Sequence, residues 1–107
     1  MKDVVGAIEL WDFNSATLTG AWDEFVTNLD EACFLIRTIN DSNTDVFISY
    51  NGINYHDFVP AGETLELSFQ AINRYPAKKV FPRGQQVWLL GAAGVGSIYL
   101  AGYYSKL

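Results

Sequence analysis

The sequence predicts an all-β protein, an antiparallel β-sandwich that is jelly-roll-like and has about eight short strands. Two observations carry this prediction. Short segments alternate apolar and polar residues with a period of two, and they are rich in β-branched and aromatic side chains. Turn residues recur about every 8–12 positions between these segments, which is typical of sandwiches and barrels. The chain has 107 residues, enough for one domain, so we expect residues 1–107 to form a single β-sandwich domain.

The first 30 residues have the least regular pattern. Residues 6–13 (GAIELWDF) are expected to form a strand. In residues 21–32, a set of apolar side chains fits helical spacing, but it also permits an irregular strand and turn. We favour extended structure in residues 21–32 because the neighbouring segments are β. An alternative for residues 1–30 is an extended arm or interface segment. The side chains in question are Trp22, Phe25, Val26 and Leu29.

The remaining strands follow from alternation. Residues 64–70 (TLELSFQ) place Leu65, Leu67 and Phe69 on one side and polar side chains on the other, as a half-buried strand does. Residues 31–39 (EACFLIRTI) are apolar on both faces at their start, which favours a central strand covered on both sides. The other expected strands are residues 45–50, 85–90 and 96–104.

Residues with specific turn chemistry separate the strands. Residues 40–45 (NDSNTD) carry short polar side chains that bond nearby backbone groups, and they should join two strands. The pair Asn51-Gly52 suits a type I′ turn, in which both central residues have positive φ. Pro60 and Gly62 favour another tight reversal.

Two further connections are expected near the C-terminus. Residues 91–97 (GAAGVGS) should close the last hairpin, because a phosphate-binding loop would need a following helix and a Lys. Residues 72–84 contain two prolines and no clean period, so we expect a long connection with room for one short edge strand.

The reactive side chains do not make up a catalytic or metal site. His56 is the only histidine and Cys33 the only cysteine. Catalysis by His56 would need an orienting acceptor and a nucleophile or water, and a zinc site needs about three or four ligands. We therefore interpret His56 as a hairpin residue and Cys33 as a buried small hydrophobe without a disulfide. The expectation is a protein that is not an enzyme and has no cofactor or metal.

Two acidic segments leave alternatives open. Residues 40–45 offer oxygen ligands for calcium, but they lack the spacing and the distal Glu of an EF-hand, so an Asx-rich turn is preferred. Several carboxylates near the N-terminal third allow a glycosidase-type pair, although such a window is more typical of a solvated face. These carboxylates are Asp23, Glu24, Asp30 and Glu31.

Charge and hydropathy argue against nucleic acid and membrane as partners. The net charge is -5 and the pI about 4.5, which disfavours binding to a phosphate backbone. A small basic group is interpreted as a solvated loop. No apolar stretch is long enough to span a bilayer, and the start lacks a signal peptide, so we expect synthesis in a reducing cytosol. The basic group is Arg74, Lys78, Lys79 and Arg83.

The aromatic content points to a binding role. Aromatic residues make up 15% of the chain, many for a small domain, and large rings are enriched at protein interfaces. We expect partner contacts from Trp11 and Trp22 in the N-terminal segment and from Tyr99 and Tyr103 on the last strand. The alternatives are that the other sheet or the N-terminal segment covers the face of the last strand with Tyr99 and Tyr103, or that exposed rings form a lectin-like platform for sugars.

One part of the chain resembles a known class of virion protein. The successions IRTINDSNTDVFISYNGINYHDFVPAGETLELSF and FPRGQQVWLLGAAGVGSIYLAGYY, in residues 35–104, resemble small virion proteins of tailed bacteriophages. Such domains are similar to jelly-roll capsid decoration (cement) proteins. The resemblance implies a homo-oligomer, a dimer or trimer, made in the host cytoplasm, that binds between major capsid subunits on the capsid surface. A connector, tail-fibre or carbohydrate-binding module of the virion is the alternative.

Overall fold

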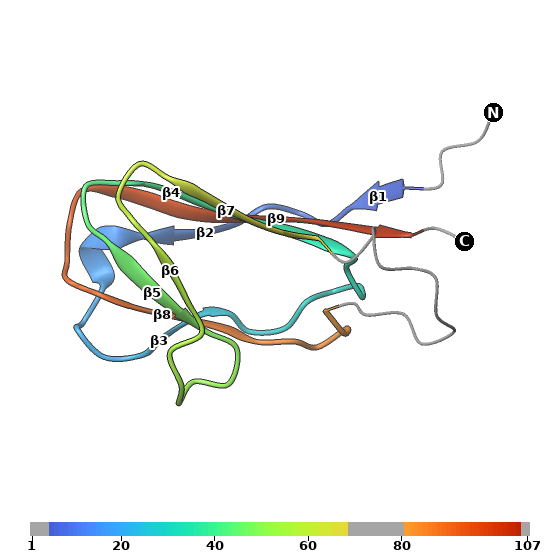
Figure 1. Ribbon diagram of the computed structural model, residues 1–107, viewed down its shortest axis with the longest axis horizontal. Helices are drawn as coiled ribbons and strands as arrows, with labels where there is room; N and C mark the ends of the chain where they lie inside the picture. Colours follow the sequence, from blue (N-terminus) through green and yellow to red (C-terminus); the bar gives the residue numbers. More distant parts are fainter. Residues whose placement is uncertain (1–4, 69–80, 106–107) are drawn as a thin grey trace.

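The structure, a computed structural model, describes residues 5–68 and 81–105 (Figure 1). Within these residues the chain is almost entirely β, with nine strands and one short 3-10 turn, η1 (Ser15–Thr17). No helix in this part is long and apolar enough to cross a membrane. The strands are β1 (Val5–Ala7), β2 (Trp11–Asn14), β3 (Asp23–Val26), β4 (Leu35–Ser42), β5 (Val46–Ser49), β6 (Asp57–Val59), β7 (Thr64–Ser68), β8 (Val87–Gly91) and β9 (Gly96–Ser105).

Two antiparallel sheets make up the sandwich. The larger sheet has the order β1–β9–β4–β7, with β2 also paired to β9, and the smaller sheet has the order β3–β8–β5–β6. The pairs are nested: β2 pairs with β9, β3 with β8, β4 with β7 and β5 with β6. The chain is therefore one long hairpin folded over into two layers, which Figure 1 shows with β4, β7 and β9 above β3, β5 and β8. This is the strand order of a jelly roll, and the predicted fold class is confirmed.

Alternation along each strand fills the space between the sheets. On β9, Ile98 and Leu100 are fully buried, and Tyr99 between them points outward. Val46 and Ile48 are fully buried in the same way on β5. Burying one such side chain contributes about 1.5–3 kcal/mol, so a register slip that turned these residues outward would be strongly disfavoured.

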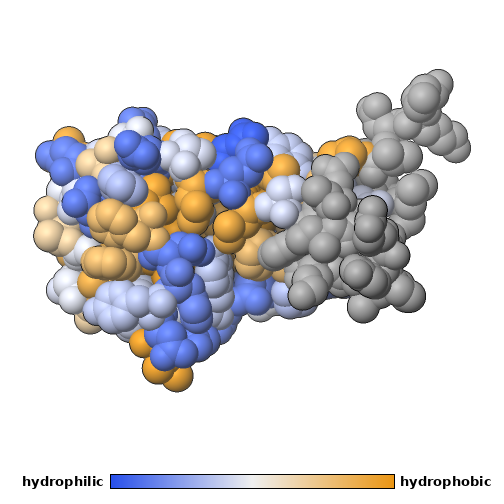
Figure 2. Space-filling model, viewed as in Figure 1, coloured by the Kyte–Doolittle hydropathy of each residue, from blue (hydrophilic) through white to orange (hydrophobic). Residues whose placement is uncertain are grey.

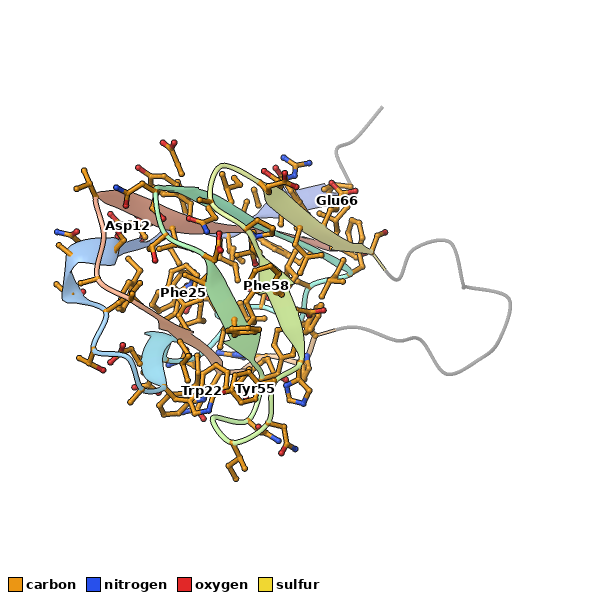
Figure 3. All side chains as sticks on the ribbon, turned by 60° about the vertical axis from the view of Figure 1, so that its left-hand side comes forward. Asp12, Trp22, Phe25, Tyr55, Phe58 and Glu66 are labelled. Atoms are coloured by element: carbon orange, nitrogen blue, oxygen red, sulfur yellow. The ribbon has the colours of Figure 1, made fainter. Side chains whose placement is uncertain are left out.

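Residues 5–30 are a component of the sandwich and not an arm beside it. They supply β1 and β2 to the larger sheet and β3 to the smaller one. Residues 23–26 are extended, as favoured over a helix, and Phe25 points into the core between the two sheets (Figure 3). Phe13 on β2 contacts Phe25 edge-to-face, with ring centroids 6.0 Å apart, and so joins the two layers.

A register shift divides the single strand predicted for residues 6–13. Ala7 lies opposite Tyr103, whereas Trp11 lies opposite Leu100. The segment from Ala7 to Trp11 therefore has one residue more than the facing segment of β9. Such a bulge changes which side chains face inward. Ile8 and Trp11 both pack against the core, which a strict period of two would not allow.

Only one of the predicted turns joins neighbouring strands of the same sheet. Residues 50–56 link β5 to β6, whereas the turns after β4, β6 and β8 carry the chain from one sheet to the other. The prediction that residues 91–97 close a hairpin is therefore wrong, since β8 and β9 belong to different sheets. Turn chemistry reverses the chain, but partners far away in the sequence decide which sheet the next strand joins.

Pro60 and Gly62 lie in the turn after β6. The Glu63 N–H donates to the Pro60 carbonyl at 3.1 Å, and Gly62 has a φ of 79°, a conformation that glycine adopts without steric conflict. Asp45 Oδ1 accepts from the Ala61 N–H at 2.8 Å and ties this turn to the start of β5.

The long connection predicted for residues 72–84 lies mostly outside the described residues, as do Phe69 and Gln70 at the predicted end of β7. The described chain resumes at Phe81, whose backbone N–H and carbonyl both bond to Cys33 at 2.8 Å. Of the basic group noted in the sequence, the described residues include Arg83, which is exposed.

Asn40 is a fully buried polar residue that joins the two sheets at one end. Its Nδ2 donates to the carbonyls of Thr44 at 2.8 Å and Val59 at 2.9 Å, and its Oδ1 accepts from the Ser42 hydroxyl. Residues 40–45 therefore form the end of β4 and a polar turn, in which the side chains of Asn40, Ser42, Asn43 and Asp45 are hydrogen-bonded within the protein.

Replacing Asn40 by alanine should destabilise the sandwich. The change removes the buried side-chain donor to the Val59 carbonyl and one of the two side-chain donors to the Thr44 carbonyl, which costs about 1–3 kcal/mol of unfolding free energy. Urea unfolding followed by circular dichroism measures the loss. Asp41→Ala is the control, because Asp41 is exposed and should change stability by less than about 0.5 kcal/mol. Equal effects of the two changes would contradict the role given to Asn40.

Candidate functional site

Aromatic side chains form a continuous series of ring contacts on the outer face of the smaller sheet. The ring centroid of Trp22 lies 5.0 Å from that of Tyr55. Tyr55 in turn lies 5.1 Å from Phe47, which lies 4.9 Å from Phe58. We call these four residues the aromatic surface. Figure 3 shows Trp22 and Tyr55 next to each other at the bottom of the sandwich and Phe58 above them, with Glu66 of the larger sheet at the top.

The register of the strands places these rings on one face. Phe47 on β5 lies opposite both Phe58 on β6 and Leu90 on β8, and residues paired across strands point to the same side. The residues on either side of Phe47 are fully buried, so Phe47 points away from the core. The aromatic surface is therefore built on a row that crosses the sheet.

This surface is exposed to solvent. Tyr55 is 62% exposed, Phe58 46% and Phe47 38%. With about 200 Å² of surface per aromatic side chain, these fractions amount to roughly 300 Å² of exposed ring, a size at which apolar patches on monomers often bind partners. Ile53, in the same loop as Tyr55, adds an aliphatic side chain that is 75% exposed. Figure 2 shows hydrophobic atoms at the tip of this loop.

The β5–β6 loop, residues 50–56, is held by its own hydrogen bonds. Asn51 Oδ1 accepts from the backbone N–H groups of Ile53 at 2.9 Å and Asn54 at 3.0 Å. It also accepts from the Ser49 hydroxyl at 2.9 Å, and the Ser49 oxygen accepts from the Gly52 N–H at 2.9 Å. Asn51 lacks positive φ, so the expected type I′ turn is wrong. In a loop of this length Asn51 serves as a side-chain acceptor instead.

Gly52 lies against the indole ring of Trp88 on β8. A Cβ at this position would be 2.9 Å from the ring carbon Cε2, closer than a side chain can approach without displacing its neighbour. The φ of Gly52 is 75°, in the region that favours glycine. Trp88 Nε1 is buried, with no hydrogen-bond partner among the described residues. The loop therefore rests on the Trp88 ring, which stays partly exposed elsewhere.

His56 holds the loop in place. Its Nδ1 accepts from the Tyr50 N–H at 3.0 Å, and its ring stacks on that of Tyr50 with centroids 5.5 Å apart. The Tyr50 hydroxyl donates to Asp57 at 2.8 Å. Burial, the hydrogen bond to Asp57 and the charge of Asp57 raise the pKa of Tyr50 far above its usual range. These contacts agree with the interpretation of His56 as a hairpin residue.

The other candidate reactive groups lie apart from the loop. Cys33 is fully buried, and burial, followed by the charge of Glu31, raises the pKa of its thiol, the opposite of what activates a nucleophile. Asp23 accepts from the backbone N–H and the hydroxyl of Thr19, both at 2.9 Å. In residues 5–68 and 81–105, no group of three or more His, Cys, Asp or Glu could hold a metal ion.

The residues predicted to contact a partner lie in different parts of the sandwich. Trp22 belongs to the aromatic surface, whereas Trp11 is partly buried and packs against the core. Tyr99 and Tyr103 point outward from β9 on the larger sheet, and both are partly buried. The structure does not bring these residues together, and their contact with a partner stays a prediction.

Sequence reasoning missed Phe47, Tyr55 and Phe58. A signal for two of them was present, because Phe47 and Phe58 occupy the outward positions of alternating strands, where polar side chains are usual. Tyr55 carried no such signal, since its place depends on how the loop folds back on the sheet. A large ring at the polar positions of a strand is thus the feature to look for.

A shallow pocket lies beside Trp11, between the β1–β2 bulge and the β3–β4 connection. Its volume is about 270 Å³. It combines an indole ring with carboxylate and amide side chains, which can accept and donate hydrogen bonds. The residues that line it are Glu9, Leu10, Trp11, Asp12, Asn28 and Asp30.

Comparison of the chain with protein-family models, curated proteins and solved structures gave no match. The described residues offer two candidate sites, the aromatic surface and the pocket beside Trp11.

Replacing Gly52 by alanine should lift the loop from Trp88. The added Cβ conflicts with the ring, so we expect a loss of about 2–4 kcal/mol in unfolding free energy together with a change in tryptophan fluorescence. Gly20→Ala is the matched control: Gly20 has a similar φ of 85°, but nothing lies within 4 Å of its added Cβ. That change should cost only about 1–2 kcal/mol from the backbone conformation. If both variants lose the same stability with unchanged fluorescence, the contact with Trp88 is unimportant.

Proposed function

We propose that this chain is a structural protein of a bacteriophage virion, specifically a capsid decoration (cement) protein that stabilises the shell by binding between major capsid subunits. The observation that carries the proposal is the exposed aromatic surface, which suits burial against a neighbouring virion subunit. The class of virion protein comes from the resemblance of residues 35–104 described above. In this role the chain is not an enzyme and uses no cofactor.

The composition of the aromatic surface supports a protein–protein contact. Interface centres are rich in aromatic residues and poor in charge. The outward rows of the smaller sheet contain Phe47, Phe58, Leu90, Trp88 and one carboxylate, Glu24. Rings also immobilise few rotatable bonds when they are buried, which keeps the entropic cost of binding low.

The size of the surface supports a contact that is repeated many times. A standard interface buries about 800 Å² per partner, more than twice the area of exposed ring on this face. One such contact would be weak. On a symmetric shell the same contact recurs at every equivalent position, and linked weak contacts together hold firmly.

The fold is compatible with this role without establishing it. Jelly rolls occur in viral capsid proteins and in lectins, among other proteins. A fold of this kind hosts unrelated functions, so function depends on the surface that the fold carries.

Alanine at both Tyr55 and Phe58 should lower binding to purified virus particles at least tenfold. Each change removes a ring from the centre of the contact, and central aromatic residues carry most of the binding free energy. Co-sedimentation of the purified protein with particles that lack it measures the effect. Val95→Ala is the control, because Val95 is 75% exposed and lies in the β8–β9 connection, outside the aromatic surface. Unchanged binding of the double variant would assign the contact to another face.

The number of copies in purified virions, measured by mass spectrometry, tests the location separately. Hundreds of copies per particle indicate the capsid, and about a dozen indicate the connector or tail. A chain that is absent from purified virions contradicts the proposal as a whole.

A carbohydrate-binding module of the connector or tail fibre is the second candidate, and the pocket beside Trp11 favours it. Sugars bind by stacking on aromatic rings and by hydrogen bonds to carboxylate and amide groups. Both kinds of group line this pocket, with Trp11 next to Asp12 and Asn28. The pocket lies apart from the aromatic surface, so each candidate can be tested without disturbing the other.

Titration with a panel of oligosaccharides, followed by tryptophan fluorescence, should give saturable quenching if this second candidate holds. Asn28→Ala and Asp30→Ala should then weaken binding at least fivefold, because they remove hydrogen-bonding groups from the pocket. Thr27→Ala is the control, since Thr27 is exposed but does not line the pocket. Fluorescence that no sugar changes would reject the module.

A further inference from the structure

We propose that the pocket beside Trp11 binds a positively charged amino sugar, a hexosamine whose amino group is free and protonated. The inference rests on the second candidate function, the carbohydrate-binding module, and names the class of sugar that this module takes. The pocket lies apart from the aromatic surface, so the inference does not depend on which subunit that surface contacts.

Two segments of the chain form the walls of the pocket. The first is residues 9–12, from the β1–β2 connection and the start of β2, and the second is residues 28–30, between β3 and β4. Leu29 is fully buried, and its backbone N–H and carbonyl are bonded to residues 85 and 84 at 3.0 and 2.9 Å. This anchor fixes Asn28 and Asp30 on either side of it. The walls are therefore in place before a ligand arrives, which keeps the entropic cost of binding low.

The indole ring of Trp11 supplies a surface for stacking. Trp11 packs against the core, which fixes its position, and it is only partly buried, so it also lines the pocket. An aromatic ring accepts the C–H face of a sugar ring by apolar contact. The face of an indole also attracts an ammonium group through its quadrupole. A charged sugar can make both contacts with this one ring.

The pocket carries negative charge that no described cation offsets. Glu9, Asp12 and Asp30 line it, and none of these carboxylates forms an ion pair or a side-chain hydrogen bond with another described residue. Among the described arginines, Arg37 is paired on the larger sheet and Arg83 does not line the pocket. In a chain with a net charge of -5, such a pocket attracts cations and disfavours acidic sugars.

The placement of the carboxylates suits an organic cation better than a metal ion. In residues 5–68 and 81–105, no group of three His, Cys, Asp or Glu side chains could hold a metal ion. The three carboxylates thus line the pocket without meeting at one point. An amino sugar fits this arrangement, because its ammonium group donates to one carboxylate and its hydroxyl groups donate to the others. Asn28 can both donate to and accept from the remaining hydroxyl groups.

The size of the pocket limits the ligand to about one sugar unit. Its volume of about 270 Å³ is just below the range of about 300–1,000 Å³ that is usual for drug-sized ligands. The pocket is shallow and its carboxylates are exposed, so water and salt screen their charge. We therefore expect weak binding of a single sugar, and we expect this binding to fall as the salt concentration rises.

Isothermal titration calorimetry of the full chain with three methyl β-glycosides tests the inference. Methyl glucosaminide carries the ammonium group, methyl glucoside has a hydroxyl in its place, and methyl N-acetylglucosaminide has a neutral acetamide. At low salt and about pH 6, where such an amine is protonated, methyl glucosaminide should bind at least fivefold more tightly than either neutral sugar. This preference should disappear at about 0.5 M salt, where screening acts over only a few ångströms.

Glu9→Gln should reduce the preference for methyl glucosaminide at least threefold, because it removes a charge from the pocket and keeps the shape of the side chain. Glu63→Gln is the matched control. Glu63 is exposed in the turn between β6 and β7 and does not line the pocket, and the change in net charge is the same. Circular dichroism of both variants checks that they remain folded.

A preference for the charged sugar that Glu9→Gln reduces and Glu63→Gln keeps would support the inference. Equal binding of the three glycosides, or equal losses in the two variants, would overturn it and leave the carbohydrate-binding module standing. No binding of any glycoside or oligosaccharide would reject the module as well. Nα-acetylarginine amide, titrated in the same way, tests the source of the cation. Binding as tight as that of methyl glucosaminide would overturn the amino sugar and assign the pocket to a basic side chain of a protein.

Discussion

The pairing of β9 with β1, β2 and β4 is the interaction on which the rest of the structure depends (Figure 1). These partners come from the start and the middle of the chain, whereas β9 comes last. Neither the larger sheet nor the core between the sheets is complete without Ile98 and Leu100. Because such contacts join distant segments, we expect the chain to fold slowly for its size, as proteins rich in non-local pairs do.

The nested pairing also explains where the candidate site lies. Within residues 5–68 and 81–105, β5 and β6 are the one pair of consecutive strands that are hydrogen-bonded to each other, so the β5–β6 loop is the tip of the long hairpin. The strands that flank it carry Phe47 and Phe58 on their outer side. Trp88 on β8 packs under Gly52 of the loop, and Trp22, the residue before β3, contacts Tyr55. Residues from the chain before the β5–β6 loop and from the chain after it thus both contribute to the site.

The sequence predicted what depends on near neighbours. Alternation identified β5 and β7, and it indicated that Val46 and Ile48 lie inside. It did not indicate that β5, after residues 40–45, and β9, after residues 91–97, belong to a different sheet from the strand before them. The sheet that a strand joins depends on partners far along the chain. The same limit applies to the site. Phe47 faces outward by simple alternation, but its contact with Tyr55 depends on the bonds that Asn51 makes inside the loop.

One feature of the larger sheet bears on how the protein can be handled. Val5 and Ser105, near the two ends of the chain, are partners in the β1–β9 pair, and both lie far from the β5–β6 loop (Figure 1). A fluorescent label or affinity handle fused at either end would leave the rings accessible. A short peptide joining the two ends would close a loop of little entropic cost, so the chain could be circularly permuted. New ends would then be opened in the β8–β9 connection, where an exposed turn links the two layers.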